Sequence, residues 1–192
     1  MRAMSLSHWV FWLTGACGVV SLSACNDPFD LGRAFFENSV DTTTIFALRG
    51  TAIQLPSAFD IVVNQTARTD RAEPFDFAFD IDANGRAVLL PARTLGFSVN
   101  AGILVSDSTF DAVTDAPLEG YTDSIAVAIQ VGDIFVARSR VTNAQCGLLG
   151  SLPRYGKFRV LVIDTQQRLL TVETLVNINC GFRGLEPGTP ID

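Results

Sequence analysis

Histidine is almost missing from this sequence, since its single copy, His8, lies in an apolar stretch near the N-terminus. The rest of the chain therefore lacks the imidazole that a Ser-His-Asp triad, a Cys-His pair or a His-ligated zinc or haem site requires. A glycine-rich phosphate loop, a Cys-x-x-Cys pair and a Ser-x-x-Lys motif are also missing. We therefore expect no enzymatic activity, no cofactor and no metal site.

Positive charge is scarce as well. The chain carries 14 Lys and Arg residues against 20 Asp and Glu residues, which gives a formal net charge of −6. Lys157 is the sole lysine, and both tryptophans, Trp9 and Trp12, lie in the apolar N-terminal stretch. Nucleic-acid binding normally requires a basic surface, so the composition argues against a nucleic-acid partner.

The N-terminus has the plan of an export signal. Arg2 precedes an apolar stretch from Trp9 to Leu22, and small residues follow. The stretch ends in Leu22-Ser23-Ala24-Cys25, which resembles the lipobox of bacterial lipoproteins. The resemblance implies that the Cys25 thiol carries a diacylglycerol and that the chain is cut just before it. The protein would then be held at a membrane through its lipid anchor, outside the cytoplasm.

Two alternatives compete with lipidation at Cys25. Cys17 follows Thr14-Gly15-Ala16 and lacks the large aliphatic residue that a lipobox has three places upstream. An uncleaved membrane anchor would need roughly 20 apolar residues, more than this stretch supplies. Asn26, and not Asp, follows Cys25, which by the sorting rule of enterobacterial lipoproteins mildly favours the outer membrane over the periplasmic face of the inner membrane.

Cys146 and Cys180 remain after Cys25. An even pair of cysteines in an exported protein predicts a disulfide. Cys146 precedes the strand expected at 157–163, and Cys180 follows the strand expected at 169–176. These two strands form one expected hairpin, so both cysteines lie at the same end of it and a bridge between them is geometrically reasonable.

The chain beyond residue 41 alternates between short strands and turn signals. Strands are expected at residues 42–48, 58–63, 75–82, 87–90, 96–105, 125–129, 134–140, 157–163 and 169–176. This pattern predicts an all-β fold behind an N-terminal signal helix, as a single antiparallel β-sandwich or a small β-barrel of about 8–10 strands. The expected divisions are a signal peptide at 1–24, a tether at 25–41, the all-β domain at 42–180 and an irregular tail at 181–192.

The clearest strand pattern runs from residue 75 to residue 82. Its apolar side is Phe75, Phe77, Phe79 and Ile81, and its other side is Asp76, Ala78, Asp80 and Asp82. We expect the aspartates to form a solvated face. A catalytic carboxylate pair is the less favoured alternative. The stretch 80–85 also resembles the first half of a calcium loop, but Pro91 stands where the closing Glu should be.

A basic patch is a more specific hypothesis for a binding site than the aspartates are. Arg138 and Arg140 share one side of an expected strand, as do Lys157 and Arg159 on another. If Arg140 faced Lys157 across an antiparallel pair, Arg138 would face Arg159. Such like charges repel unless something neutralises them. Acidic residues of the domain, such as Glu173, would neutralise them from within. An anionic ligand, a lipid headgroup or an acidic partner surface would neutralise them from outside.

These observations favour a lipid-anchored envelope protein that acts as a binding or accessory module for another envelope component. A lipoprotein that binds a small anionic or apolar ligand is the alternative, and a hydrolase that uses carboxylates alone is the least favoured class. A phenylalanine-lined cavity would favour the ligand binder. A filled core with an apolar surface would favour the partner role.

Overall fold

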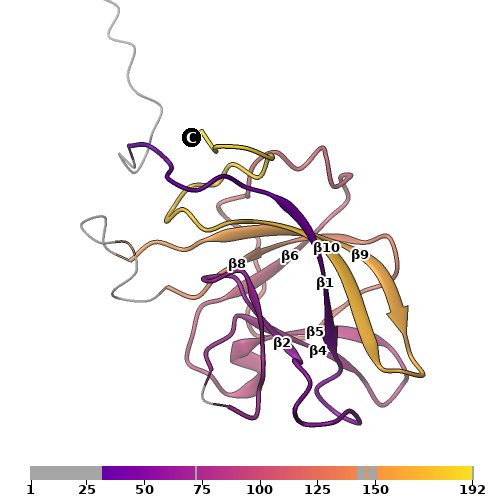
Figure 1. Ribbon diagram of the computed structural model, residues 1–192. Coiled ribbons are helices and arrows are strands. Elements are labelled where there is room, and N and C mark those ends of the chain that lie inside the picture. The colour runs from indigo at the N-terminus through magenta and orange to yellow at the C-terminus, as the bar shows by residue number, and fades with distance from the viewer. Residues whose placement is uncertain (1–31, 72, 142–145, 147–150, 192) are drawn as a thin grey trace, which may run out of the picture.

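The computed structural model describes residues 32–71, 73–141, 146 and 151–191, so the predicted signal peptide and Cys25 lie outside the described residues. Within these residues, ten strands form two antiparallel five-stranded sheets that pack face to face (Figure 1). The predicted all-β class is confirmed, and the β-sandwich is the architecture observed. No helix in this part of the chain is long and apolar enough to cross a membrane.

The first sheet has the strand order β1-β10-β9-β8-β6. Its strands are β1 (Val40–Phe46), β10 (Leu169–Asn177), β9 (Tyr155–Asp164), β8 (Ile134–Arg138) and β6 (Gly102–Ser106). The second sheet has the order β3-β2-β4-β5-β7. Its strands are β3 (Gln65–Ala67), β2 (Ala58–Asp60), β4 (Phe77–Ile81), β5 (Ala87–Pro91) and β7 (Val127–Ala128), and a 3-10 helix, Ala92–Leu95, follows β5.

The space between the sheets is filled by aromatic rings. Phe59 and Phe77 of the second sheet meet Phe135 and Phe158 of the first, with ring centroids between 4.8 and 5.8 Å apart. Phe79 is buried in the same cluster. Alternate residues of a strand face opposite sides, which is why the predicted inward positions Phe77, Phe79 and Ile81 all reach this core. Phe75 precedes β4 and packs elsewhere.

The outer faces of both sheets are partly covered, which the sequence pattern did not predict. A second cluster, built around Phe110, Val113, Tyr155 and Leu185, covers the outside of the first sheet. A third, which includes Phe75 and Ala78, covers the outside of the second. The predicted solvated face of β4 is therefore wrong, because Asp76 is 1% exposed and Asp80 is fully buried.

Two hairpins agree with the predicted turns. Ile81 pairs with Ala87 across the turn between β4 and β5, where Gly85 adopts φ +79°, a left-handed conformation that costs glycine little. Leu169 pairs with Asp164 at the start of the β9–β10 ladder, and Arg168 takes the positive φ of that turn. A register shift between Thr171 and Val172 introduces a bulge into this ladder.

Three buried asparagines join the beginning and the end of the described chain. Asn38 exchanges backbone hydrogen bonds with Gly188, and its side chain donates to the carbonyls of Gly184 and Glu186. The Asn177 side-chain oxygen accepts hydrogen bonds from the backbone and side-chain nitrogens of Asn179. Figure 1 shows the first described residues and the C-terminal residues at the same end of the sandwich.

The predicted disulfide is confirmed. Cys146 and Cys180 are bonded, with their Cα atoms 5.6 Å apart and a sequence separation of 34. Cys180 lies just beyond β10, so the bridge ties the segment that follows β8 to the end of the first sheet.

Candidate functional site

The basic patch predicted from the sequence does not form as a single cluster. In the β8–β9 ladder, Lys157 faces Val136 and Arg159 faces Ile134, whereas Arg138 faces Tyr155. The supposed pairing of Arg140 with Lys157 is therefore wrong by four residues. β8 also ends at Arg138, so Arg140 lies beyond the β8–β9 ladder.

Arg140 lies in a buried ionic cluster between the two sheets. Its Nη2 atom is 2.9 Å from Asp60 Oδ2, and its Nη1 atom is 3.2 Å from Asp76 Oδ1. The backbone nitrogens of Arg140 and Ile61 donate to the two Asp76 oxygens, each at 2.7 Å. Burial raises the pKa of Asp76 to about 6, and the Arg140 charge limits this rise.

The ionic cluster continues toward the disulfide through Arg154. Arg154 donates to the Val62 carbonyl, and its Nη2 atom lies 3.5 Å from Cys180 Sγ. Desolvation lowers the pKa of Arg154, and the Asp60 charge opposes that shift. Asp60 and Asp76 converge as a catalytic pair would, but both are buried. A substrate cannot reach them in this arrangement, so the cluster acts as a structural tie between the sheets.

Lys157 is also buried and holds the loop that covers the first sheet. Its ammonium donates to the carbonyls of Phe110 and Val113, at 2.8 and 3.0 Å, and lies 4.5 Å from the centre of the Phe110 ring. Desolvation lowers the pKa of Lys157, whereas the nearby Asp111 raises it. The carbonyl oxygens thus solvate a charge that has left water.

Arg138 and Arg159 are more exposed and are both occupied. The Arg159 guanidinium forms an ion pair with Glu173, its cross-strand neighbour on β10. Arg138 stacks over the Tyr121 ring at 4.9 Å and donates to the Asn100 carbonyl. The expected internal neutralisation by Glu173 is therefore observed for Arg159.

The turn that resembles a calcium loop is closed by its own side chains. The Asp82 carboxylate accepts hydrogen bonds from the backbone nitrogens of Asn84 and Arg86 and from Arg86 Nε. The buried Asp80 carboxylate lies 2.6 Å from Arg49 Nε and 3.5 Å from Arg168 Nη2. Among the described residues, no group of three or more His, Cys, Asp or Glu residues could hold a metal ion.

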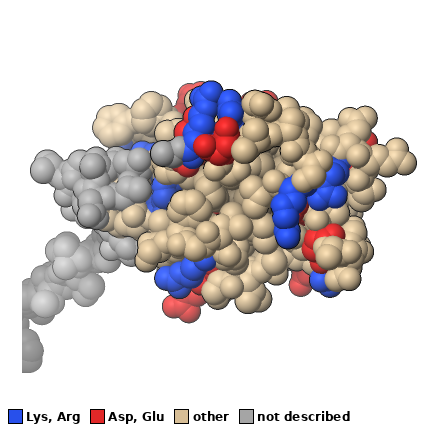
Figure 2. Space-filling model, turned by 90° about the horizontal axis from the view of Figure 1, so that it is seen from below, with Lys and Arg blue, Asp and Glu red and all other residues tan. Residues whose placement is uncertain are grey.

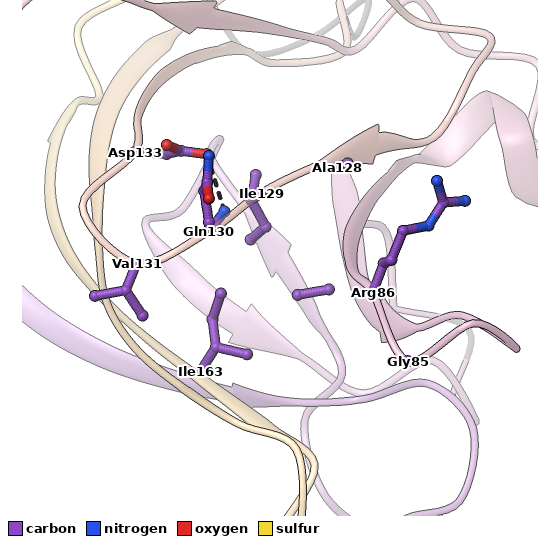
Figure 3. A pocket seen from close by; sticks show the side chains of 9 residues that line it. Gly85, Arg86, Ala128, Ile129, Gln130, Val131, Asp133 and Ile163 are labelled. Carbon is purple, nitrogen blue, oxygen red and sulfur yellow. Dashed lines mark hydrogen bonds between the residues drawn. The ribbon is translucent and has the colours of Figure 1, made fainter.

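An open apolar hollow of about 480 Å³ lies at the mouth between the two sheets (Figure 3). Ile129, Val131 and Ile163 supply its apolar wall, and Arg86 stands on its far side. Asp133 accepts a hydrogen bond from the Gln130 backbone nitrogen at 2.9 Å, which fixes the turn that presents Val131. Val131 is 62% exposed, so the hollow is a surface feature and not an internal cavity.

Among the described residues, the hairpin end of the molecule carries no extended patch of one charge. Figure 2 views the molecule from this end, and its blue and red groups lie beside each other, separated by uncharged surface. Arg86 and Asp82 form a partly exposed ion pair in the turn between β4 and β5, and the exposed Arg49 is paired with the buried Asp80. An anion would therefore find little unneutralised positive charge on this face.

Sequence reasoning missed Asp60 and the three asparagines. Asp60 interrupts the apolar run Phe59–Val62, and a lone charge in a buried strand implies a partner; that signal could have been read. Asn177 and Asn179 lie two residues apart near the end of the chain. Nothing in that spacing indicates that Asn38, far away in the sequence, belongs to the same part of the fold.

Comparisons with known protein families, with curated proteins and with solved structures found no match.

Proposed function

We propose that this protein is a lipid-anchored envelope protein whose β-sandwich binds or braces another envelope component. The Leu22-Ser23-Ala24-Cys25 sequence supports the anchor. The Cys146–Cys180 disulfide supports an oxidising compartment outside the cytoplasm. The proposal assigns no catalytic step to the domain.

The filled core is the observation that carries the binding role. Four phenylalanine rings occupy the centre of the sandwich, which leaves no phenylalanine-lined cavity between them. Recognition then falls to the surface. The hollow beside Val131 and Ile163 offers apolar side chains at an open mouth, which suits a protruding side chain or short segment of a partner.

The test uses the full chain in its own cells. Mass spectrometry of the purified protein first reads the modification of Cys25, and a diacylglycerol-bearing N-terminus at that residue is expected. A photoreactive residue in place of Val131 should then give a protein adduct of defined mass in native membranes. The same residue in place of the exposed Leu118, on the loop over the first sheet, is the control. An unmodified Cys25, or equal adducts at both positions, would refute the proposal.

A small apolar ligand in the same hollow is the second candidate function. Its volume lies within the range of roughly 300–1,000 Å³ of small-molecule sites. The exposure of Val131 argues against this function, because small-molecule sites normally bury most of the surface of the ligand. Mass spectrometry of the intact protein under non-denaturing conditions separates the two functions: a retained small molecule that Val131→Asp abolishes favours the ligand.

A further inference from the structure

Two adjacent phenylalanines are exposed to solvent near the start of the described chain. Phe35 is 90% exposed and Phe36 is 56% exposed. A single exposed apolar residue is ordinary in a folded protein, but this pair has a large exposed neighbour. Ile191 is 86% exposed, and it lines a hollow together with Arg33 and Ala34, the two residues that precede the pair.

The backbone of this aromatic pair is fixed by a buried side chain. The Asn179 Oδ1 atom accepts hydrogen bonds from the backbone nitrogens of Phe35 and Phe36, at 2.9 and 3.0 Å. The Asn179 Nδ2 atom donates to the Phe36 carbonyl at 2.8 Å. Asn179 is itself held by Asn177 at the end of β10. The fold therefore holds two large rings at its surface instead of letting them collapse onto the core.

The position of Cys25 indicates what covers this pair. Phe35 comes ten positions after Cys25, and ten residues of fully extended chain span at most about 33–36 Å. The aromatic pair and the C-terminal residues lie at the end of the sandwich where the described chain begins (Figure 1). An anchor at Cys25 would keep the membrane within this short reach of the pair.

We propose that Phe35, Phe36 and Ile191 rest in the interfacial layer of the membrane that holds the acyl chains. The inference rests on the lipid anchor of the proposed function. Phenylalanine and aliphatic side chains bind at this depth by burying apolar area. The domain then stands on the bilayer with its C-terminal end against the lipid. The hairpin end and the hollow beside Val131 face away from that surface.

The test exploits the lack of tryptophan beyond Trp12. After cleavage before Cys25, Phe35→Trp gives the acylated protein a single tryptophan, which is excited selectively over the two tyrosines of the chain at the long-wavelength edge of its absorption. Ile53→Trp is the matched control, because Ile53 is 67% exposed and lies between β1 and β2 at the opposite end of the sandwich. Both acylated variants are reconstituted into phosphatidylethanolamine–phosphatidylglycerol vesicles that contain lipids brominated close to the headgroup.

Tryptophan at position 35 is expected to emit at shorter wavelength and to be quenched several-fold more than tryptophan at position 53. Added salt should leave the quenching unchanged, because the three side chains carry no charge. Acylated protein with unquenched tryptophan at both positions would overturn this inference and leave the anchor standing. A blue shift without quenching would assign the pair to a contact with a second copy of the chain, since the vesicles contain no other protein, and would also overturn it. An unmodified Cys25 would overturn the inference together with the proposed function.

Discussion

The Nη2 atom of Arg140 lies 2.9 Å from Oδ2 of Asp60, which joins the segment after β8 in one sheet to the last residue of β2 in the other. Both side chains are almost completely removed from water. The desolvation cost of such a pair offsets much of its attraction, so the pair adds little net stability. Removing only one member of the pair is strongly destabilising, because an uncompensated buried charge remains.

Arg140→Met is expected to destabilise the sandwich by about 3–5 kcal/mol, because Asp60 and Asp76 lose their cationic partner. Urea unfolding followed by circular dichroism measures this loss. Arg159→Gln is the matched control from the same predicted patch. Its ion pair with Glu173 is partly exposed, so its cost should stay near 0–1 kcal/mol. Equal losses in both variants would contradict the assignment of Arg140 to a buried cluster.

The buried Asp76 carboxyl should make stability fall as the pH rises from about 4 to about 6. The pKa of Asp76 in the folded protein is raised to about 6 from an ordinary value of 3.8. Between these values the folded state binds more protons than the unfolded state, so the free energy of unfolding decreases with rising pH. At about 1.4 kcal/mol per pKa unit, the contribution is on the order of 2–3 kcal/mol.

Asp76→Asn isolates this effect, because the amide does not titrate. The difference in unfolding free energy between wild type and variant, measured in urea from pH 3.5 to 7, should change mainly within this window. Other carboxyl groups, such as Asp70 and Asp82, whose pKa values are lowered mainly by hydrogen bonds from Arg68 and Arg86, contribute equally to both proteins. A difference that stays constant over this range would contradict a raised pKa for Asp76.

The fold was predictable because period-two patterns report which side of a strand is apolar. Phe77, Phe79 and Ile81 reached the core for this reason. The register of β8 against β9 was not predictable in the same way. Lys157 faces Val136 and not Arg140, a shift of four residues. A shift by an even number leaves every side chain on its original face, so the apolar pattern fits both registers equally well.

The burial of Asp76 shows a second limit of the sequence pattern. An aspartate between apolar residues is typical of a strand with one wet face. Asp76 can be buried because Arg140, 64 residues further on, satisfies its carboxylate. The Arg140 guanidinium supplies the opposite charge, and the Arg140 backbone nitrogen donates a hydrogen bond. Contacts of this range depend on the packing of whole sheets, which local patterns do not encode. The disulfide between Cys146 and Cys180 was predictable, because few cysteines leave few pairings.

Reduction of the Cys146–Cys180 disulfide is expected to lower the unfolding free energy by about 3–4 kcal/mol, as the chain-entropy relation gives for a closed loop of this length. Urea unfolding with and without dithiothreitol measures the loss. The Cys146→Ser, Cys180→Ser double variant controls for side effects of the reductant and should match the reduced protein. If the midpoint is insensitive to dithiothreitol, the bridge does not form in solution or contributes nothing.

Lys157→Met is expected to loosen the loop over the first sheet. The methionine keeps most of the apolar stem but leaves the Phe110 and Val113 carbonyls without their donor. An unsatisfied buried polar group costs about 1–3 kcal/mol. Hydrogen–deuterium exchange should therefore increase in peptides that cover residues 108–116 and stay unchanged in β4. Uniformly faster exchange over the whole domain would instead indicate global destabilisation and would contradict a local role for Lys157.

Asn179→Ala is expected to release the Phe35–Phe36 segment while the sandwich stays folded. The variant loses the acceptor for two backbone nitrogens and the donor to the Phe36 carbonyl. Amide exchange at Phe35 and Phe36, followed by nuclear magnetic resonance, should accelerate, because these backbone groups then open to water. Asn100→Ala is the control, since Asn100 accepts from the Val141 nitrogen elsewhere in the fold. Unchanged exchange in Asn179→Ala would mean that other contacts hold the aromatic pair, and the asparagine network would lose its assigned role in presenting it.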